Sequence, residues 1–187
     1  MTMRRRPVSR PVPLRAAAGI AALTAALTVA VAVEPASAAE PKLLGNHRDW
    51  AAYMFEESGK KVCYASSVPK SSEPKAARRG SIYTLVTHRP AENALDVVSV
   101  VVGYPLRKGS EITVEVDNKK FMLFTDGETG WGRDADTDKA LAQAIKAGSK
   151  MVIKGVSQRG TNTADTYSLA GAGAALDAIN DACGVKR

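Results

Sequence analysis

The first 38 residues determine how the rest of the chain has to be interpreted. Three arginines at positions 4–6 give a cationic start, and residues 16–33 carry no charge. Ala36 and Ala38 then supply the small residues of an A-x-A cleavage site. This order is typical of a secretory signal peptide, so we expect residues 1–38 to be removed and the chain to be exported by general secretion.

A membrane anchor is the alternative for the same apolar stretch, which is 18 residues long and near the lower limit for a spanning helix. The stretch is rich in alanine rather than leucine, and a cleavage site follows it at once. We therefore expect no transmembrane span after processing. The first cysteine is Cys63, far from the cleavage point, which excludes a lipoprotein anchor.

Cleavage leaves residues 39–187, which is 149 of the 187 residues and the usual size of one domain. The whole chain has a formal net charge of +7, but the signal peptide holds five of its arginines and one glutamate, so the mature domain is only about +3. The high pI belongs mostly to the removed segment. We therefore expect no nucleic-acid partner, and export argues further against one.

The mature domain has two cysteines, Cys63 and Cys183. An even pair in an oxidising compartment favours a disulfide over two buried thiols. The bond would close a loop of 120 residues, which the chain-entropy model values at roughly 5 kcal/mol. We expect it to join the early part of the domain to its last helical turn.

Strand patterns dominate the mature chain. Isoleucine and valine alternate with polar residues over 111–116, which predicts a half-buried strand. A turn at Asp117-Asn118 leads into residues 119–124, which predicts a hairpin. A nearly continuous β-branched run predicts a buried strand over 95–104. Further strands are predicted over residues 50–55, 62–66, 81–88, 151–157 and 163–169.

Two helices are predicted, over residues 137–147 and 173–183. The second places Leu176, Ile179 and Cys183 on one apolar face, which directs Cys183 toward the core. Residues 68–80 hold two prolines and four basic residues, and we expect a mobile, solvated connection there. Many short strands with two helical additions predict an antiparallel β-sandwich.

Catalytic patterns are weak. His47 and His88 are the only histidines, no G-x-S-x-G motif accompanies them, and we expect both on the surface. Asp134, Asp136 and Asp138 resemble the start of a calcium loop, but its sixth and twelfth positions hold lysine and isoleucine. These acids suit the start of a helix instead. No Cys/His cluster has zinc spacing, so we expect no metal and no cofactor.

The most distinctive stretch covers residues 155–169 and is rich in hydroxyl and amide groups. Its polar side chains are candidates for a binding groove: Arg159, Thr161, Asn162, Thr163 and Asp165. The alternative, which we favour, is a hairpin with a turn at Arg159-Gly160 and an exposed threonine face.

Short motifs spread along the domain resemble the invasion-associated locus B family of exported alphaproteobacterial proteins. Each motif is weak alone, but their order covers almost the whole mature domain. They are Trp50, Lys61-Val62-Cys63-Tyr64, Arg79-Gly80, Val102-Gly103-Tyr104-Pro105, residues 121–125, Gly130-Trp131, Ser157-Gln158-Arg159-Gly160-Thr161, Asp165-Thr166-Tyr167-Ser168-Leu169 and Ala182-Cys183.

This resemblance implies a mainly β, immunoglobulin-like antiparallel β-sandwich with two short helices, in the periplasm, in the outer envelope or secreted. It implies no catalytic residues, and a link to host-cell invasion in pathogenic relatives. The chain departs from the family pattern after Leu169, where Ala170-Gly171-Ala172 replaces a glycine followed by an aromatic residue. We expect a non-catalytic protein that binds an envelope protein or a cell-surface polymer; the alternative is a hydrolase acting on envelope material.

Overall fold

The computed structural model describes residues 40–75 and 78–186. The expected signal peptide, residues 1–38, lies outside the described residues. Among the residues that are described, no helix is long and apolar enough to cross a membrane. The elements described below therefore belong to the expected mature domain.

The described chain forms one sheet of eleven strands, in the order β1-β2-β3-β5-β6-β9-β8-β7-β10-β11-β4, and each neighbouring pair is antiparallel. In chain order, the elements are β1 (Lys42–His47), β2 (Trp50–Glu57), β3 (Lys60–Ser67), β4 (Ser71–Glu73), β5 (Tyr83–Arg89), the 3₁₀ turn η1 (Pro90–Glu92), β6 (Ala94–Val101), β7 (Glu111–Val116), β8 (Lys119–Asp126), β9 (Thr129–Trp131), α1 (Ala135–Ala147), β10 (Lys150–Val156), β11 (Asn162–Ser168) and α2 (Ala172–Cys183).

The sheet curls until its two ends meet. The indole Nε1 of Trp50, at the start of β2, donates to the carbonyl of Ser168, at the end of β11, over 3.1 Å. The amide of Asp49 likewise donates to the carbonyl of Ala170. The core therefore lies between two halves of one sheet, as in a sandwich. Mainly β structure with antiparallel pairing and two helices confirms the predicted fold class.

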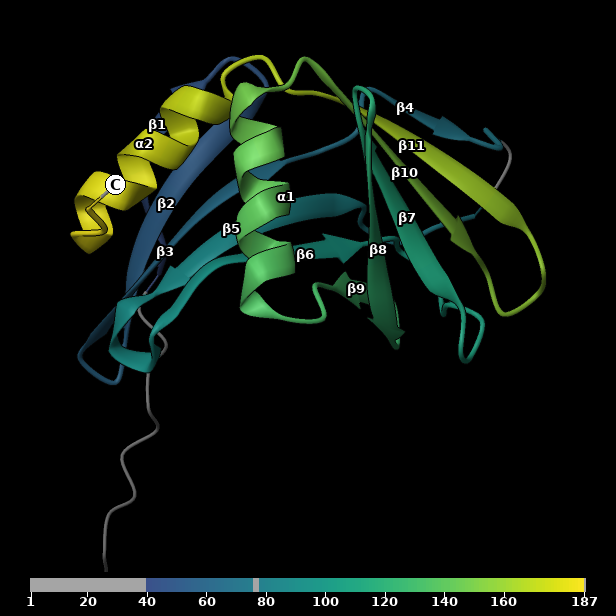
Figure 1. Ribbon diagram of the computed structural model, residues 1–187, viewed down its shortest axis with the longest axis horizontal. Helices are drawn as coiled ribbons and strands as arrows, with labels where there is room; N and C mark the ends of the chain where they lie inside the picture. The colour runs from purple at the N-terminus through teal and green to yellow at the C-terminus, as the bar shows by residue number, and fades with distance from the viewer. Residues whose placement is uncertain (1–39, 76–77, 187) are drawn as a thin grey trace, which may run out of the picture. The chain divides into compact units, whose positions relative to one another are not determined.

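Both helices cover the half made of β1, β2, β3, β5 and β6 (Figure 1). α1 packs on β6, and α2 packs on the first three strands. The helices and both halves of the sheet contribute to one apolar cluster. In it, the inward-facing alternate residues of the strands pack against the apolar faces of the helices. Its fully buried members include Val86, Val98, Ile112, Val114, Leu141, Ile145, Ile153 and Ile179.

The predicted hairpins are present. β7 pairs with β8 across the turn at Asp117-Asn118, and Val114 lies opposite Phe121. β10 pairs with β11, and Ile153 lies opposite Asp165. The short strands β1, β4 and β9 were not predicted from the sequence, because each shows little of the apolar alternation that identifies a half-buried strand.

α2 is held to the sheet by a disulfide between Cys63 of β3 and Cys183. Leu176, Ile179 and Cys183 are all buried on the face that packs against the strands. The predicted pairing and the predicted direction of Cys183 are both confirmed. The bond connects segments 120 residues apart, near the two ends of the described chain.

Within residues 68–75 and 78–80, most residues are exposed, as their composition predicts, but the segment is not a simple connection. Ser71–Glu73 pairs with β11 as an edge strand. The side chain of Arg79 is only 5% exposed. A basic side chain can be buried where a carboxylate pairs with it, and Asp165 pairs with Arg79 here.

Candidate functional site

Three connections that are far apart in the sequence meet at one place. They are residues 78–80 before β5, residues 103–107 after β6, and the β10–β11 turn at residues 157–161. The amide of Gly80 donates to the carbonyl of Gly103 over 2.7 Å, and the amide of Gln158 donates to that of Pro105 over 2.8 Å. Backbone bonds therefore fix the three connections against one another.

A groove of about 760 Å³ lies between these connections. The first connection contributes Arg78 and Arg79, with Pro74 nearby; the second contributes residues 103–105; and the third contributes residues 157–159 and 161, with Thr163. We refer to this cavity as the arginine groove. It brings together three of the motifs on which the family resemblance rests.

A buried ion pair lies beneath the arginine groove. Arg79 donates from Nη1 to Oδ1 of Asp165 over 2.6 Å, and from Nη2 to Oδ2 over 2.5 Å. Nε and Nη2 also donate to the carbonyl of Val102 over 3.0 and 2.9 Å. Four of the five guanidinium N–H groups are thus used, and the fifth, on Nη1, has no partner in the described part of the chain. This two-bond geometry fixes the plane of the guanidinium.

Tyr104 supports the pair from one side. The Cζ atom of Arg79 lies 5.0 Å from the centroid of its ring, a cation–π distance. The hydroxyl of Thr163 donates to the carbonyl of Gly155, and its oxygen lies 2.5 Å from the hydroxyl of Tyr104. Burial raises the pKa of Tyr104, while the Thr163 hydrogen bond opposes that rise. Tyr104 is therefore a neutral structural group at neutral pH.

Three further arginines surround the groove. Arg78 and Arg159 line it and are exposed. A β-carbon built on Gly160 would lie 3.0 Å from Nη2 of Arg107, so the Arg107 guanidinium covers the turn. None of the three side chains forms an ion pair or hydrogen bond with the residues that the structure describes. No Asp or Glu among the described residues lines the groove, so its rim has excess positive charge.

The structure separates the five predicted binding residues. Arg159 and Thr161 line the arginine groove from its turn, and Thr163 lies in its floor. Asp165 is 1% exposed and pairs with Arg79, so a ligand does not reach it directly. Asn162 lines a neighbouring depression instead. The favoured hairpin is present, but the threonine face is not fully exposed, because Thr163 points inward.

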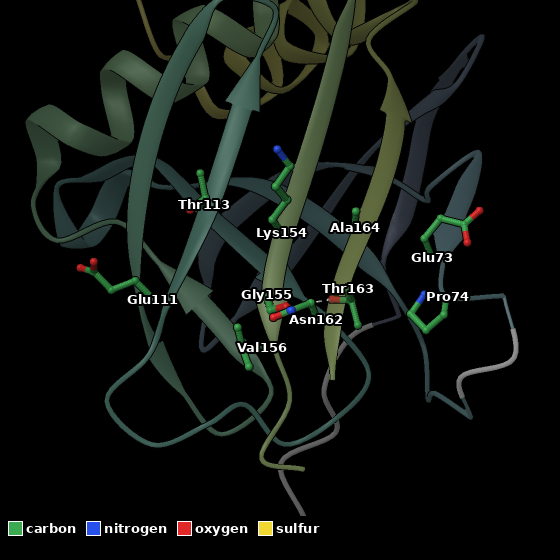
Figure 2. Close-up of a pocket in the computed structure, with 10 residues that line it drawn as sticks. All are labelled: Glu73, Pro74, Glu111, Thr113, Lys154, Gly155, Val156, Asn162, Thr163 and Ala164. Carbon is green, nitrogen blue, oxygen red and sulfur yellow. Dashed lines mark hydrogen bonds between the residues drawn. The ribbon is translucent and has the colours of Figure 1, made fainter. Parts of the chain in front are cut away.

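The neighbouring depression, of about 540 Å³, lies over β7, β10 and β11. Figure 2 shows Gly155 and Thr163 near its middle, with Glu73, Glu111 and Lys154 toward its margins. Glu111 already pairs with Arg133, and Lys154 pairs with Glu115. Because this depression is lined by both acidic and basic side chains, its charge does not favour binding of anions over cations.

Sequence reasoning proposed Arg159 as a binding residue but missed Arg78, Arg79 and Tyr104, which also line the groove. Arg79 and Tyr104 lie in motifs that carry the family resemblance, yet nothing in their local sequence shows that they meet Asp165, which lies 86 residues beyond Arg79. The signal that could have indicated the site was the shared presence of Arg79-Gly80, Gly103-Tyr104-Pro105 and Asp165 in one ordered motif set. Long-range pairing is not visible in local periodicity.

The three aspartates lie at the start of α1, with Asp136 and Asp138 in its first turn. Asp134 is the N-cap, and its Oδ1 accepts from the amide of Thr137 over 2.7 Å, which lowers the pKa of Asp134. Asp138 accepts from the amide of Val98 over 3.1 Å. Burial raises the pKa of Asp138, and the charges of Asp134 and Asp96 raise it further. Within the described ranges, no group of three Asp, Glu, His or Cys residues could hold a metal ion.

The prediction that both histidines lie on the surface is wrong for His88, which is 0% exposed. It falls on the inward face of β5, two residues after Val86. Its Nδ1 accepts from the amide of Asp96 over 3.0 Å, so the proton of the neutral ring lies on Nε2, 2.9 Å from Oδ1 of Asn180. This ring joins β5, β6 and α2. His47 is half-buried, and neither histidine lines the arginine groove.

These features define a disulfide-bonded, mainly β domain with a cationic groove between its loops. The chain belongs to the invasion associated locus B (IalB) family, whose model matches residues 50–180, from the start of β2 into α2. The matched segment includes every residue of the arginine groove.

A solved structure shows the same fold. The crystal structure of invasion associated protein B from Bartonella henselae is similar with a TM-score of 0.52 and 15% sequence identity, over 74% of this chain and 95% of that chain. No curated protein sequence matches the chain significantly.

Proposed function

We propose that this protein is exported to the cell envelope and acts by binding rather than catalysis, with the arginine groove as its binding site. The observation that carries the proposal is the gathering of Arg78, Arg107 and Arg159, none of them ion-paired within the described chain, around one groove. Arginine side chains left without a carboxylate are suited to hold an anionic partner.

The composition of the groove favours binding over the alternative of a hydrolase. A hydrolase of the common type needs a nucleophile beside a general base. None of the described residues that line the groove is a His, Cys, Asp or Glu. Ser157 is the serine of the groove, but its Oγ accepts from the amide of Thr161 and so stabilises the turn. The side chains present are better suited to hold a ligand than to transfer its protons.

The proposed location is the periplasm or the outer envelope, or the medium after secretion. The signal peptide that the sequence predicts over residues 1–38 supports export. The Cys63–Cys183 disulfide supports an oxidising compartment. The partner that we propose is an envelope protein or a cell-surface polymer, without nucleic acid. The family name does not identify the partner of this chain, which the following experiment is designed to capture.

The test is a crosslinking pull-down from intact cells. The double variant Arg78→Gln with Arg159→Gln changes two exposed side chains and should keep its fold, checked by its melting temperature. We expect it to lose the partner that the wild type captures. The matched control, Arg133→Gln, removes an exposed arginine elsewhere and should keep the partner. A folded double variant that retains its partner, or turnover of envelope material by the purified wild type, would overturn the proposal.

A further inference from the structure

We propose that the arginine groove binds an acidic polysaccharide, meaning a sugar polymer that carries carboxylate or phosphate groups. This proposal rests on the proposed function and names the class of ligand for the same site. It combines three observations. Several arginines have no ion pair within the described chain, proline, amide and hydroxyl side chains line the groove beside them, and several backbone amides of its walls already donate hydrogen bonds.

The charge of the groove indicates an anion. Seven arginines fall within the described ranges, and three of them, Arg79, Arg89 and Arg133, pair with carboxylates. Three of the other four surround the groove. The Asp165 carboxylate beneath the groove is already neutralised by Arg79. Guanidinium groups bind carboxylate and phosphate through two parallel hydrogen bonds, so an oxyanion is the matching ligand group.

The remaining lining suits sugar. Pro74 and Pro105 are exposed and offer apolar surfaces against which the C–H face of a sugar ring can lie. Gln158 and Thr161 are also exposed and offer amide and hydroxyl groups of the kind that bond sugar hydroxyls. Charge, apolar surface and neutral hydrogen-bonding groups are thus all present in one groove.

The backbone of the walls argues against an acidic peptide. Peptides added to a strand or loop are recognised mainly through main-chain hydrogen bonds. Here the amides of Gly80, Gln158 and Gly160 already donate to carbonyls of the domain, and that of Thr161 donates to Ser157 Oγ. These bonds leave fewer main-chain donors for a peptide, which favours recognition through side chains. The same bonds keep the groove in shape, which reduces the entropy lost when a ligand binds.

The test is isothermal titration of the disulfide-intact exported protein with four probes at low salt. These are oligogalacturonate for the carboxylate, a phosphorylated mannan for the phosphate, neutral dextran of matched length, and polyglutamate of matched charge. We expect at least one of the two acidic glycans to bind, with affinity falling as salt rises. Which one binds identifies the anion. We expect no binding of dextran, and polyglutamate at least about tenfold weaker than the better glycan.

Variants locate the binding. Arg159→Gln should weaken the better glycan about tenfold, the loss typical of one charge-assisted hydrogen bond. Arg159→Lys keeps the charge but loses the planar fork, so it should recover only part of the affinity. Arg133→Gln is the matched control and should bind as the wild type does.

Three results would overturn the proposal: no binding of either acidic glycan, polyglutamate binding as tightly as the glycan, or equal weakening in Arg133→Gln and Arg159→Gln. The pull-down separates the two levels of inference. If the groove variant loses its cellular partner while both glycans fail to bind, the binding function stands and the ligand class is wrong.

Discussion

Arg79 and Asp165 are 86 residues apart in the sequence and form a two-bond ion pair in which neither side chain is more than 5% exposed. The pair joins the connection before β5 to the middle of β11. Because Arg79 also donates to the carbonyl of Val102, one guanidinium ties together three segments that border the arginine groove.

Asp165→Asn should destabilise the domain by roughly 3–5 kcal/mol, because it leaves a buried guanidinium without its charge partner. The measurement is urea unfolding of the disulfide-intact protein at pH 7. Asp177→Asn is the control: it breaks the exposed pair with Lys146, which should cost no more than about 1 kcal/mol.

Replacing both partners by apolar residues, Arg79→Met with Asp165→Leu, should cost less than Asp165→Asn alone, because no unpaired charge stays buried. If Asp165→Asn were as stable as the wild type, the ion pair would have to be more hydrated in solution than its burial indicates.

The disulfide should be closed in the exported protein and should contribute strongly to stability. Thiol labelling without reductant should modify neither Cys63 nor Cys183, and two labelled thiols would contradict the bond. Cys63→Ala with Cys183→Ala should lower the free energy of unfolding by up to roughly 5 kcal/mol, since the bond closes a long loop in the unfolded chain. Urea unfolding against the wild type measures that loss.

The mature N-terminus should be Ala39. Small residues at Ala36 and Ala38 fit the cleavage site, and the first strand of the fold, β1, starts at Lys42, just after it. Intact-mass spectrometry of the exported protein checks this directly. A mass that still includes residues 16–33 would show that the apolar segment is retained as an anchor.

Local patterns in the sequence predicted the elements whose burial is one-sided. The alternation over residues 111–116 predicted β7, and the turn at Asp117-Asn118 predicted its pairing with β8. The apolar stripe of Leu176, Ile179 and Cys183 predicted the inward face of α2. Each of these signals is contained within a few residues, so one sequence is enough to recognise it.

Long-range polar pairing could not be predicted in the same way. Arg79 in a basic, proline-containing segment looks solvated until Asp165 is placed beside it. His88 looks like an exposed strand end until Asn180 and the amide of Asp96 are found to meet its ring. In both cases the partner comes from a distant element, and burial of a polar group depends on that partner.

The last prediction concerns the pH dependence of stability at Asp138, whose pKa is raised mainly by burial, with the charges of Asp134 and Asp96 adding to the effect. A carboxyl with a raised pKa holds its proton more tightly in the folded state than in the unfolded state. Its contribution to stability therefore falls as pH rises from its unfolded pKa through its folded pKa. Asp138→Asn is neutral at every pH and can still accept from the amide of Val98. Its stability relative to the wild type should therefore increase between about pH 3.5 and pH 7.

Asp134→Asn is the matched control, because the hydrogen bond from the Thr137 amide lowers the pKa of Asp134. The wild-type carboxylate there stabilises the fold above its unfolded pKa and loses that contribution as pH falls. The stability of Asp134→Asn relative to the wild type should thus decrease as pH rises toward the unfolded pKa, which is below the range in which that of Asp138→Asn increases. Urea unfolding at half-unit pH steps from strongly acidic pH to pH 7 measures both differences. Slopes of the same sign in the two ranges would contradict the assignment of opposite pKa shifts to Asp134, the N-cap, and Asp138, in the first turn of α1.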